Sequence, residues 1–152
     1  MNKITETLMR IVSEYDGDLK GAYNIREDGG CAARQSTENI KIEQKEDAPG
    51  LAVTVAAGTV GETVYVPACV TAGGIDDLVY NDFYIGDNAD VEIVAGCGIH
   101  NSGEKQSAHN GKHIFMIGDN CHVKYIERHF AEGKSDKHMS PRTEIFLGKN
   151  SV

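Results

Sequence analysis

The stretch Ile85-Gly86-Asp87-Asn88-Ala89-Asp90-Val91-Glu92-Ile93 occurs in three versions along the chain. The second reads Ile117-Gly118-Asp119-Asn120-Cys121-His122-Val123-Lys124-Tyr125, and the third begins as Leu147-Gly148-Lys149-Asn150-Ser151-Val152. Glycine and asparagine after an apolar residue and ahead of a valine indicate a bend between two strands. Recurrence roughly every thirty residues is typical of a stacked repeat. We therefore predict a stacked β fold in which these bends lie above one another.

The spacing of the repeat also predicts what lies between the bends. The period is long for one plain coil, so we expect a loop or two coils in each repeat. The segments 96–112 and 128–142 are polar and rich in histidine, and we expect them to protrude as loops. The third version stops within a strand, which predicts that residues 1–152 are the front part of a longer protein.

The remaining sequence divides into a helical start and a run of strands. Apolar residues at spacings of three and four predict a helix over residues 3–15, which we expect to cap one end of the stack. We assign residues 1–16 to this helix and residues 17–152 to the β core. Alternating patterns rich in valine and threonine predict the strands, at residues 22–26, 40–43, 51–56, 62–69, 82–85, 89–95, 113–117, 123–127 and 143–147.

Composition narrows the class of protein. The chain has 152 residues and a net charge of −8, which argues against nucleic acid or an anionic membrane as the main partner. No window approaches the ~20 apolar residues of a membrane span, and the first residues lack the apolar run of a secretion signal. We therefore expect a cytoplasmic protein, in which the four cysteines, none in a CxxC pair, are thiols.

Thiol and imidazole groups gather in one part of the chain. All six histidines and two of the four cysteines lie between residues 97 and 138. Thiolate and imidazole are ligands that zinc, copper and iron–sulfur centres prefer. Residues a full repeat apart can become neighbours in a stacked fold, so Cys97, His113 and His129 are the candidate metal ligands. The glycines beside Cys97 allow two interpretations, a reactive, sterically open thiol or a bulge at a strand end.

Several classes of enzyme are not indicated. The sequence contains no P-loop and no Gly-x-Ser-x-Gly elbow. It also lacks the His-x-His pattern of cupin metal sites. No second acidic group pairs with Asp76-Asp77 or with Glu104 as an acid–base couple, so we expect these residues to be solvated loop charges.

Four longer runs resemble the SufB/SufD family, in particular its short bacterial and archaeal members. They are Glu62-Thr63-Val64-Tyr65-Val66-Pro67-Ala68-Cys69-Val70, Asp76-Asp77-Leu78-Val79-Tyr80-Asn81-Asp82-Phe83, Val94-Ala95-Gly96-Cys97-Gly98-Ile99-His100-Asn101 and Val123-Lys124-Tyr125-Ile126-Glu127-Arg128-His129. The resemblance implies a mainly β fold, a right-handed parallel β-helix with a short N-terminal helix. It also implies a scaffold for iron–sulfur cluster assembly, paired as a homodimer or a SufB–SufD heterodimer.

The resemblance further implies that ATP is hydrolysed by a separate SufC-type ABC ATPase, so this chain would not itself be an enzyme. The candidate residues for a transient iron–sulfur cluster are Cys97, His100 and His129. The chain lacks the family's late Cys-Asp-Ser-like stretch and its C-terminal helical region.

Two other functions remain open from the sequence. One is an enzyme that binds a metal ion through Cys97, His113 and His129, and the other is a β-solenoid interaction module without chemistry. An open end of a β-helix presents unpaired strand groups. We therefore expect these 152 residues to form a dimer or to be poorly soluble.

Overall fold

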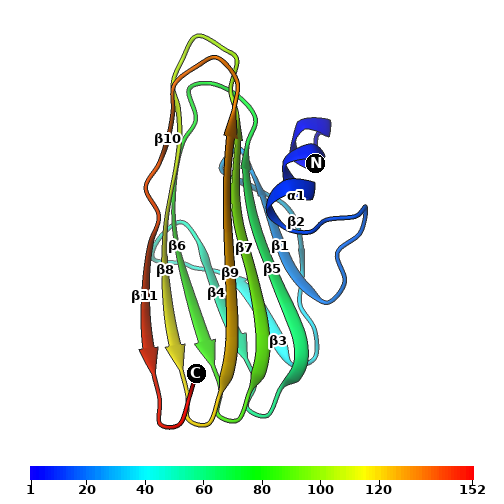
Figure 1. The fold of residues 1–152 in the computed structure, drawn as a ribbon, viewed down its shortest axis with the longest axis vertical. Coiled ribbons are helices and arrows are strands. Elements are labelled where there is room, and N and C mark those ends of the chain that lie inside the picture. The colour runs from blue at the N-terminus through cyan, green and yellow to red at the C-terminus, as the bar shows by residue number, and fades with distance from the viewer.

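The chain folds as a parallel β-solenoid of about three turns with one short N-terminal helix, in a computed structural model that describes residues 1–152 (Figure 1). The predicted β-helix is therefore confirmed. Sheet A has the strand order β2-β1-β5-β7-β9 and sheet B the order β10-β8-β6-β4-β3, with β11 also paired to β8. The elements are α1 (Lys3–Val12), β1 (Ala22–Glu27), β2 (Gly30–Gln35), β3 (Ile40–Gln44), β4 (Leu51–Val55), β5 (Val60–Val70), β6 (Asp76–Ile85), β7 (Asp90–His100), β8 (Ser107–Ile117), β9 (His122–Glu132), β10 (Lys137–Met139) and β11 (Arg142–Leu147).

Each repeat is a single coil made of one strand from each sheet, except that the sheet B side of the last coil is divided into β10 and β11. Tight bends join sheet B to sheet A at the corner end, the lower end in Figure 1, and longer connections lead back at the opposite, loop end. Of the two expectations for each repeat, the second coil is therefore wrong, whereas a connecting loop is present at the loop end. The segments 96–112 and 128–142, predicted to protrude, lie mostly in strands β7 to β11. Strand β2, which the sequence pattern did not predict, forms the edge of sheet A by pairing antiparallel with β1.

The bends at the corner end stack because glycine and asparagine meet separate requirements. Asn88, Asn120 and Asn150 have φ angles of 59°, 56° and 55°, in the left-handed region that asparagine tolerates. The glycine two residues before each asparagine is required for a different reason, the close approach of the neighbouring bend. A Cβ on Gly118, for example, would lie 2.3 Å from Asp87 Oδ1. The bend at residues 56–59 is an unpredicted fourth copy, with Gly58 at φ 75° in the position of the asparagine.

The left-handed position in the bends gives a first testable prediction. Asn120→Ala is expected to lower the free energy of unfolding by about 1 kcal/mol, because alanine is strained at this φ. Asn120→Gly should be nearly neutral, since glycine already occupies the equivalent position, Gly58, in the first bend of the stack. Chemical denaturation of the two variants measures the difference, and equal stabilities would show that φ is not what selects asparagine here.

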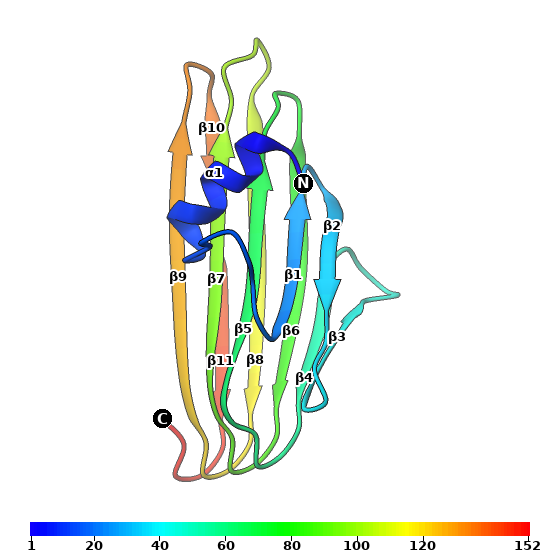
Figure 2. The ribbon, with the colours of Figure 1, turned by 90° about the vertical axis from the view of Figure 1, so that its right-hand side faces the viewer.

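Helix α1 covers the outer face of sheet A and does not cap an end of the stack, so the predicted cap is wrong. It ends at Val12, earlier than predicted, and runs across β5, β7 and β9 (Figure 2). Its buried face consists of Thr5, Leu8, Met9 and Val12. Asn2 caps the helix by accepting a hydrogen bond from the Thr5 amide at 2.8 Å.

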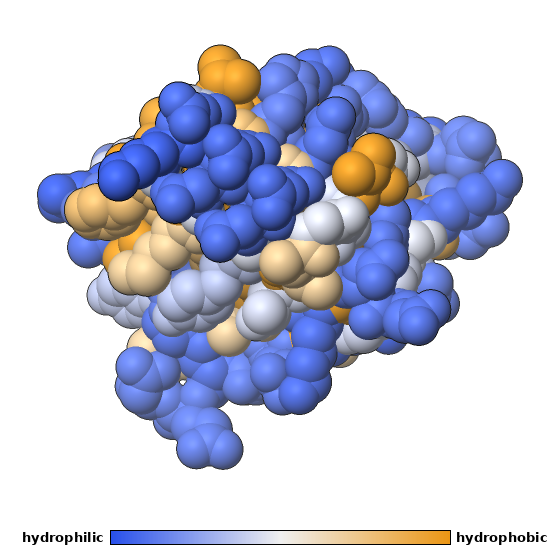
Figure 3. Space-filling model, turned by 90° about the horizontal axis from the view of Figure 1, so that it is seen from below, coloured by the Kyte–Doolittle hydropathy of each residue, from blue (hydrophilic) through white to orange (hydrophobic).

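The space between the two sheets, the lumen, is apolar toward the corner end. Phe83 and Phe115 stack there with ring centroids 4.5 Å apart, and Tyr125 is tilted against Phe115 at 4.7 Å. These rings belong to the largest buried apolar cluster of the protein. From the corner end the outer surface shows scattered hydrophobic patches among hydrophilic residues (Figure 3). The packing of these apolar side chains holds the coils together and so positions the polar half of the lumen.

Candidate functional site

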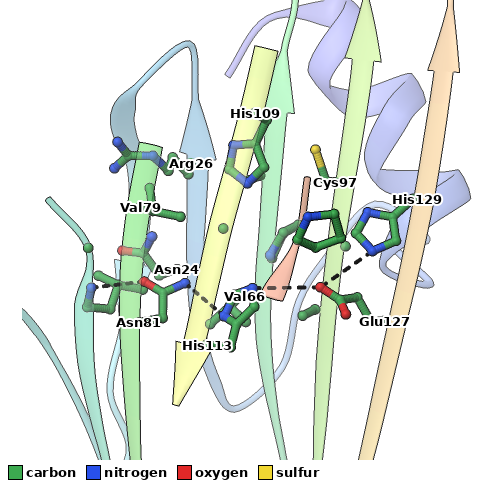
Figure 4. A pocket seen from close by; sticks show the side chains of 18 of the residues that line it. Asn24, Arg26, Val66, Val79, Asn81, Cys97, His109, His113, Glu127 and His129 are labelled. Atoms are coloured by element: carbon green, nitrogen blue, oxygen red, sulfur yellow. Dashed lines mark hydrogen bonds and ion pairs between the residues drawn. The ribbon is translucent and has the colours of Figure 1, made fainter. Parts of the chain in front are cut away.

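The lumen becomes polar about halfway toward the loop end. Inward-facing positions that hold phenylalanine and valine near the corners hold histidine, asparagine, aspartate, glutamate and arginine farther along the same strands. A cavity of about 30 Å3 lies among these side chains, with room for a water-sized molecule (Figure 4). We take this polar half of the lumen as the candidate functional site.

One buried cluster connects the two sheets across the lumen. Arg26 on β1 donates from Nε and Nη2 to the two carboxylate oxygens of Asp77 on β6, at 2.8 and 2.6 Å. His109 on β8 contacts Asp77 Oδ2 through Nδ1 at 2.9 Å. Burial opposes ionisation of Asp77, but the guanidinium and the imidazole outweigh it and hold its pKa far below the usual range. Asp77 is therefore a buried carboxylate with fixed partners.

A second cluster lies beside the first and nearer the last coil. The Glu127 carboxylate on β9 lies between two imidazoles, 3.7 Å from His113 Nε2 and 3.4 Å from His129 Nε2 (Figure 4). The His113 side chain is 8% exposed, whereas that of His129 is 34% exposed. Burial lowers the pKa of His113, although the charge of Glu127 opposes this effect. His113 is consequently neutral at neutral pH.

Cys97 borders the cavity but belongs to a small apolar cluster with Val70 and Ile99. Its sulfur points away from the Glu127 carboxylate (Figure 4). Burial strongly raises the pKa of the Cys97 thiol, and burial raises that of Cys69 to about 12. Both thiols are therefore protonated at neutral pH, and the environment of Cys97 does not activate it as a nucleophile.

The glycines beside Cys97 have a structural role that neither interpretation of the sequence predicted. They lie in the middle of β7 and face helix α1, and no irregularity interrupts the pairing of β7 with β9 there. A Cβ on Gly96 would lie 2.5 Å from Val12 O, and one on Gly98 would lie 2.9 Å from Leu8 Cβ. The bulge is thus wrong, and the glycines allow the helix to approach the sheet.

The structure brings some of the predicted site residues together. Cys97 and His129 are paired in register on neighbouring strands, and Glu127 joins His129 to His113. His100 lies apart from them, with Nδ1 2.9 Å from Glu132 Oε1 on the outer face of sheet A. No group of three or more histidine, cysteine, aspartate or glutamate side chains is arranged to hold a metal ion in this conformation.

Sequence reasoning missed the residues that complete both clusters. Asp77 is 5% exposed, so its interpretation as a solvated loop charge is wrong, whereas its neighbour Asp76 is exposed. Arg26, Asn81 and Glu127 were not predicted as site residues. The alternation Asp77-x-Val79-x-Asn81-x-Phe83 was the available signal, because it places two polar residues in line with two apolar ones on the face that turns inward.

Comparison with known proteins identifies no relative: no family model, no curated protein and no solved structure matches the chain. None of its helical structure is both long and apolar enough to cross a lipid bilayer.

Proposed function

We propose that this chain is a component of a SufB/SufD-type scaffold for iron–sulfur cluster assembly and acts with a SufC-type ABC ATPase. The observation that carries the proposal is where the four family-like runs lie. They fall on β5, β6, β7 and β9, strands that surround the polar half of the lumen. A likeness confined to the bends would be expected of many solenoids, whereas these runs include inward-facing polar residues such as Asn81 and Glu127.

The chemistry of the lumen supports this role. Cysteine thiolate and histidine imidazole are the protein ligands of iron–sulfur clusters. Cys97 and His129 are the two cluster candidates that share the lumen, and His100 would require a separate site on the outer face. Iron can bind Cys97 only after its buried thiol loses a proton. ATP hydrolysis in the partner would provide a way to open the lumen and expose this group.

The end of the solenoid formed by β9 and β11 supports the proposed pairing into a homodimer or a SufB/SufD-type heterodimer. Ile145 and Leu147 lie in register with the buried Phe115 and Ile117, yet they are 53% and 56% exposed. Both strands also end their sheets. Uncovered apolar side chains and free strand edges favour pairing with further strands.

The proposal predicts cluster formation that depends on Cys97. Anaerobic reconstitution of the protein with iron, sulfide and the ATPase should give the visible absorbance of an iron–sulfur cluster, and a tagged ATPase should retain the chain. Cys97→Ser is expected to lower the iron and sulfide content several-fold, since it removes the one thiol paired with a lumen histidine.

The matched control is Cys31→Ser, because Cys31 is exposed and lies outside the lumen. Failure of the unaltered protein both to bind the ATPase and to form a cluster would refute the proposal. Equal cluster content in Cys97→Ser and Cys31→Ser would remove Cys97 as a ligand without refuting the scaffold.

A further inference from the structure

Three successive inward-facing residues of β8, His109, Gly111 and His113, form one wall of the cavity. A Cβ on Gly111 would lie 3.1 Å from His113 Nε2 and 3.6 Å from His109 Nε2. The two ring nitrogens therefore converge on the space above the glycine. Gly111 does not have a positive φ, so the backbone does not require glycine there. The absence of a side chain instead leaves room between the two imidazoles.

The proton position on His109 follows from Asp77. This carboxylate is ionised, since Arg26 binds both of its oxygens, and it can only accept hydrogen bonds. His109 Nδ1, at 2.9 Å from Asp77 Oδ2, must therefore carry a proton. In the neutral imidazole the other nitrogen, Nε2, then has a free lone pair. The neutral ring of His109 thus presents an acceptor to the cavity.

The contact with Asn81 determines which ring nitrogen of His113 carries the proton, and the result is the reverse of that for His109. The Leu51 amide donates to Asn81 Oδ1 at 3.0 Å, which fixes the orientation of the side-chain amide. Asn81 Nδ2 then faces His113 Nδ1 at 3.4 Å and can only donate to it. His113 Nδ1 is consequently an acceptor, and the proton of the neutral ring is on Nε2. The cavity thus receives a donor from His113.

We propose that the space above Gly111 binds one neutral, water-sized molecule, which accepts a hydrogen bond from His113 Nε2 and donates one to His109 Nε2. Water has this chemistry, and the cavity of about 30 Å3 has room for it. Asp77 orients His109 as carboxylates orient histidines in catalytic and metal sites. His109 is therefore the lumen imidazole whose lone pair is presented to a bound molecule. This inference does not depend on the proposed scaffold function.

Replacing Gly111 separates this proposal from ordinary packing. Gly111→Ser and Gly111→Ala add nearly the same bulk, but the serine hydroxyl can donate and accept like the bound molecule. We expect the unfolding equilibrium constant of Gly111→Ala to be about tenfold larger than that of Gly111→Ser, because alanine leaves buried ring nitrogens without partners. Chemical denaturation measures both.

Two measurements on the unaltered protein test the site directly. Long-range proton–nitrogen spectra of the imidazoles should show the proton on Nδ1 of His109 and on Nε2 of His113. A high-resolution crystal structure should show one water within hydrogen-bonding distance of both Nε2 atoms, and none in Gly111→Ala. The opposite tautomer at either histidine, an empty cavity, or equal stability of the alanine and serine variants would overturn the proposal.

Discussion

Asp77→Ala is expected to lower the free energy of unfolding by about 3 kcal/mol. The change removes the carboxylate that binds Arg26 through two hydrogen bonds and His109 through one. Breaking a buried ion pair by deleting one partner leaves the other charge without compensation, which typically costs about 3–5 kcal/mol. We expect a value at the lower end of this range because the Arg26 side chain is 21% exposed, so water partly compensates its charge. Equilibrium denaturation in urea measures the loss.

The sequence offers a matched control in the next residue. Asp76 is exposed and its side chain is not part of either buried cluster, so Asp76→Ala should change the stability by less than about 0.5 kcal/mol. Asp77→Asn keeps the shape but not the charge, and we expect it to lie between the other two variants. Similar small losses for Asp76→Ala and Asp77→Ala would show that the buried cluster does not stabilise the fold.

The same carboxylate predicts a dependence of stability on pH. The pKa of Asp77 is far lower in the folded protein than its ordinary value near 4, so the unfolded chain binds the proton more tightly. Its contribution is present in full above about pH 4 and is lost as the pH falls toward the folded-state pKa. Below pH 4, the stability of the unaltered protein should therefore approach that of Asp77→Ala, and a constant difference would contradict this assignment.

The stacked β fold could be predicted because its bends repeat in sequence. Asn88, Asn120 and Asn150 mark three corners, since each corner requires the same left-handed backbone and the same close approach. The fourth corner escaped prediction because Gly58 meets the φ requirement with a different residue type. The strands are also longer than predicted, because polar residues that face the lumen look in sequence like residues of a solvated loop.

The candidate site could be predicted only in part, because it depends on register between coils. Composition located the histidines and Cys97, but Asp77 and His109 meet only because β6 and β8 pair these two residues directly. That register is determined by the bends and by the packing of Phe83 on Phe115 farther along the same strands. The alternation with Val79 and Phe83 indicates that Asp77 faces inward, but it does not show that His109 is the residue that Asp77 meets on the next coil.

Gly96→Ala is expected to displace helix α1 and to lower the free energy of unfolding by about 2 kcal/mol. The added methyl group would lie 2.5 Å from the carbonyl oxygen of Val12, which is backbone and can move only with the helix. Overpacking of this kind typically costs about 1–3 kcal/mol. The helix also covers Cys69, whose Sγ lies 4.0 Å from Thr5 O. Displacement should therefore make a second thiol, in addition to the exposed Cys31, react with a thiol reagent.

A glycine with open surroundings provides the control. Gly30 begins β2, has no positive φ, and a Cβ there would make only ordinary contact, 3.6 Å from Glu27 O. Gly30→Ala should leave both the stability and the number of reactive thiols unchanged. If Gly96→Ala behaves in the same way, the close contact of α1 with sheet A does not determine the position of the helix. If the second thiol reacts but stability is unchanged, the added methyl group displaces the helix, and the packing of the helix on the sheet contributes little to the free energy of unfolding.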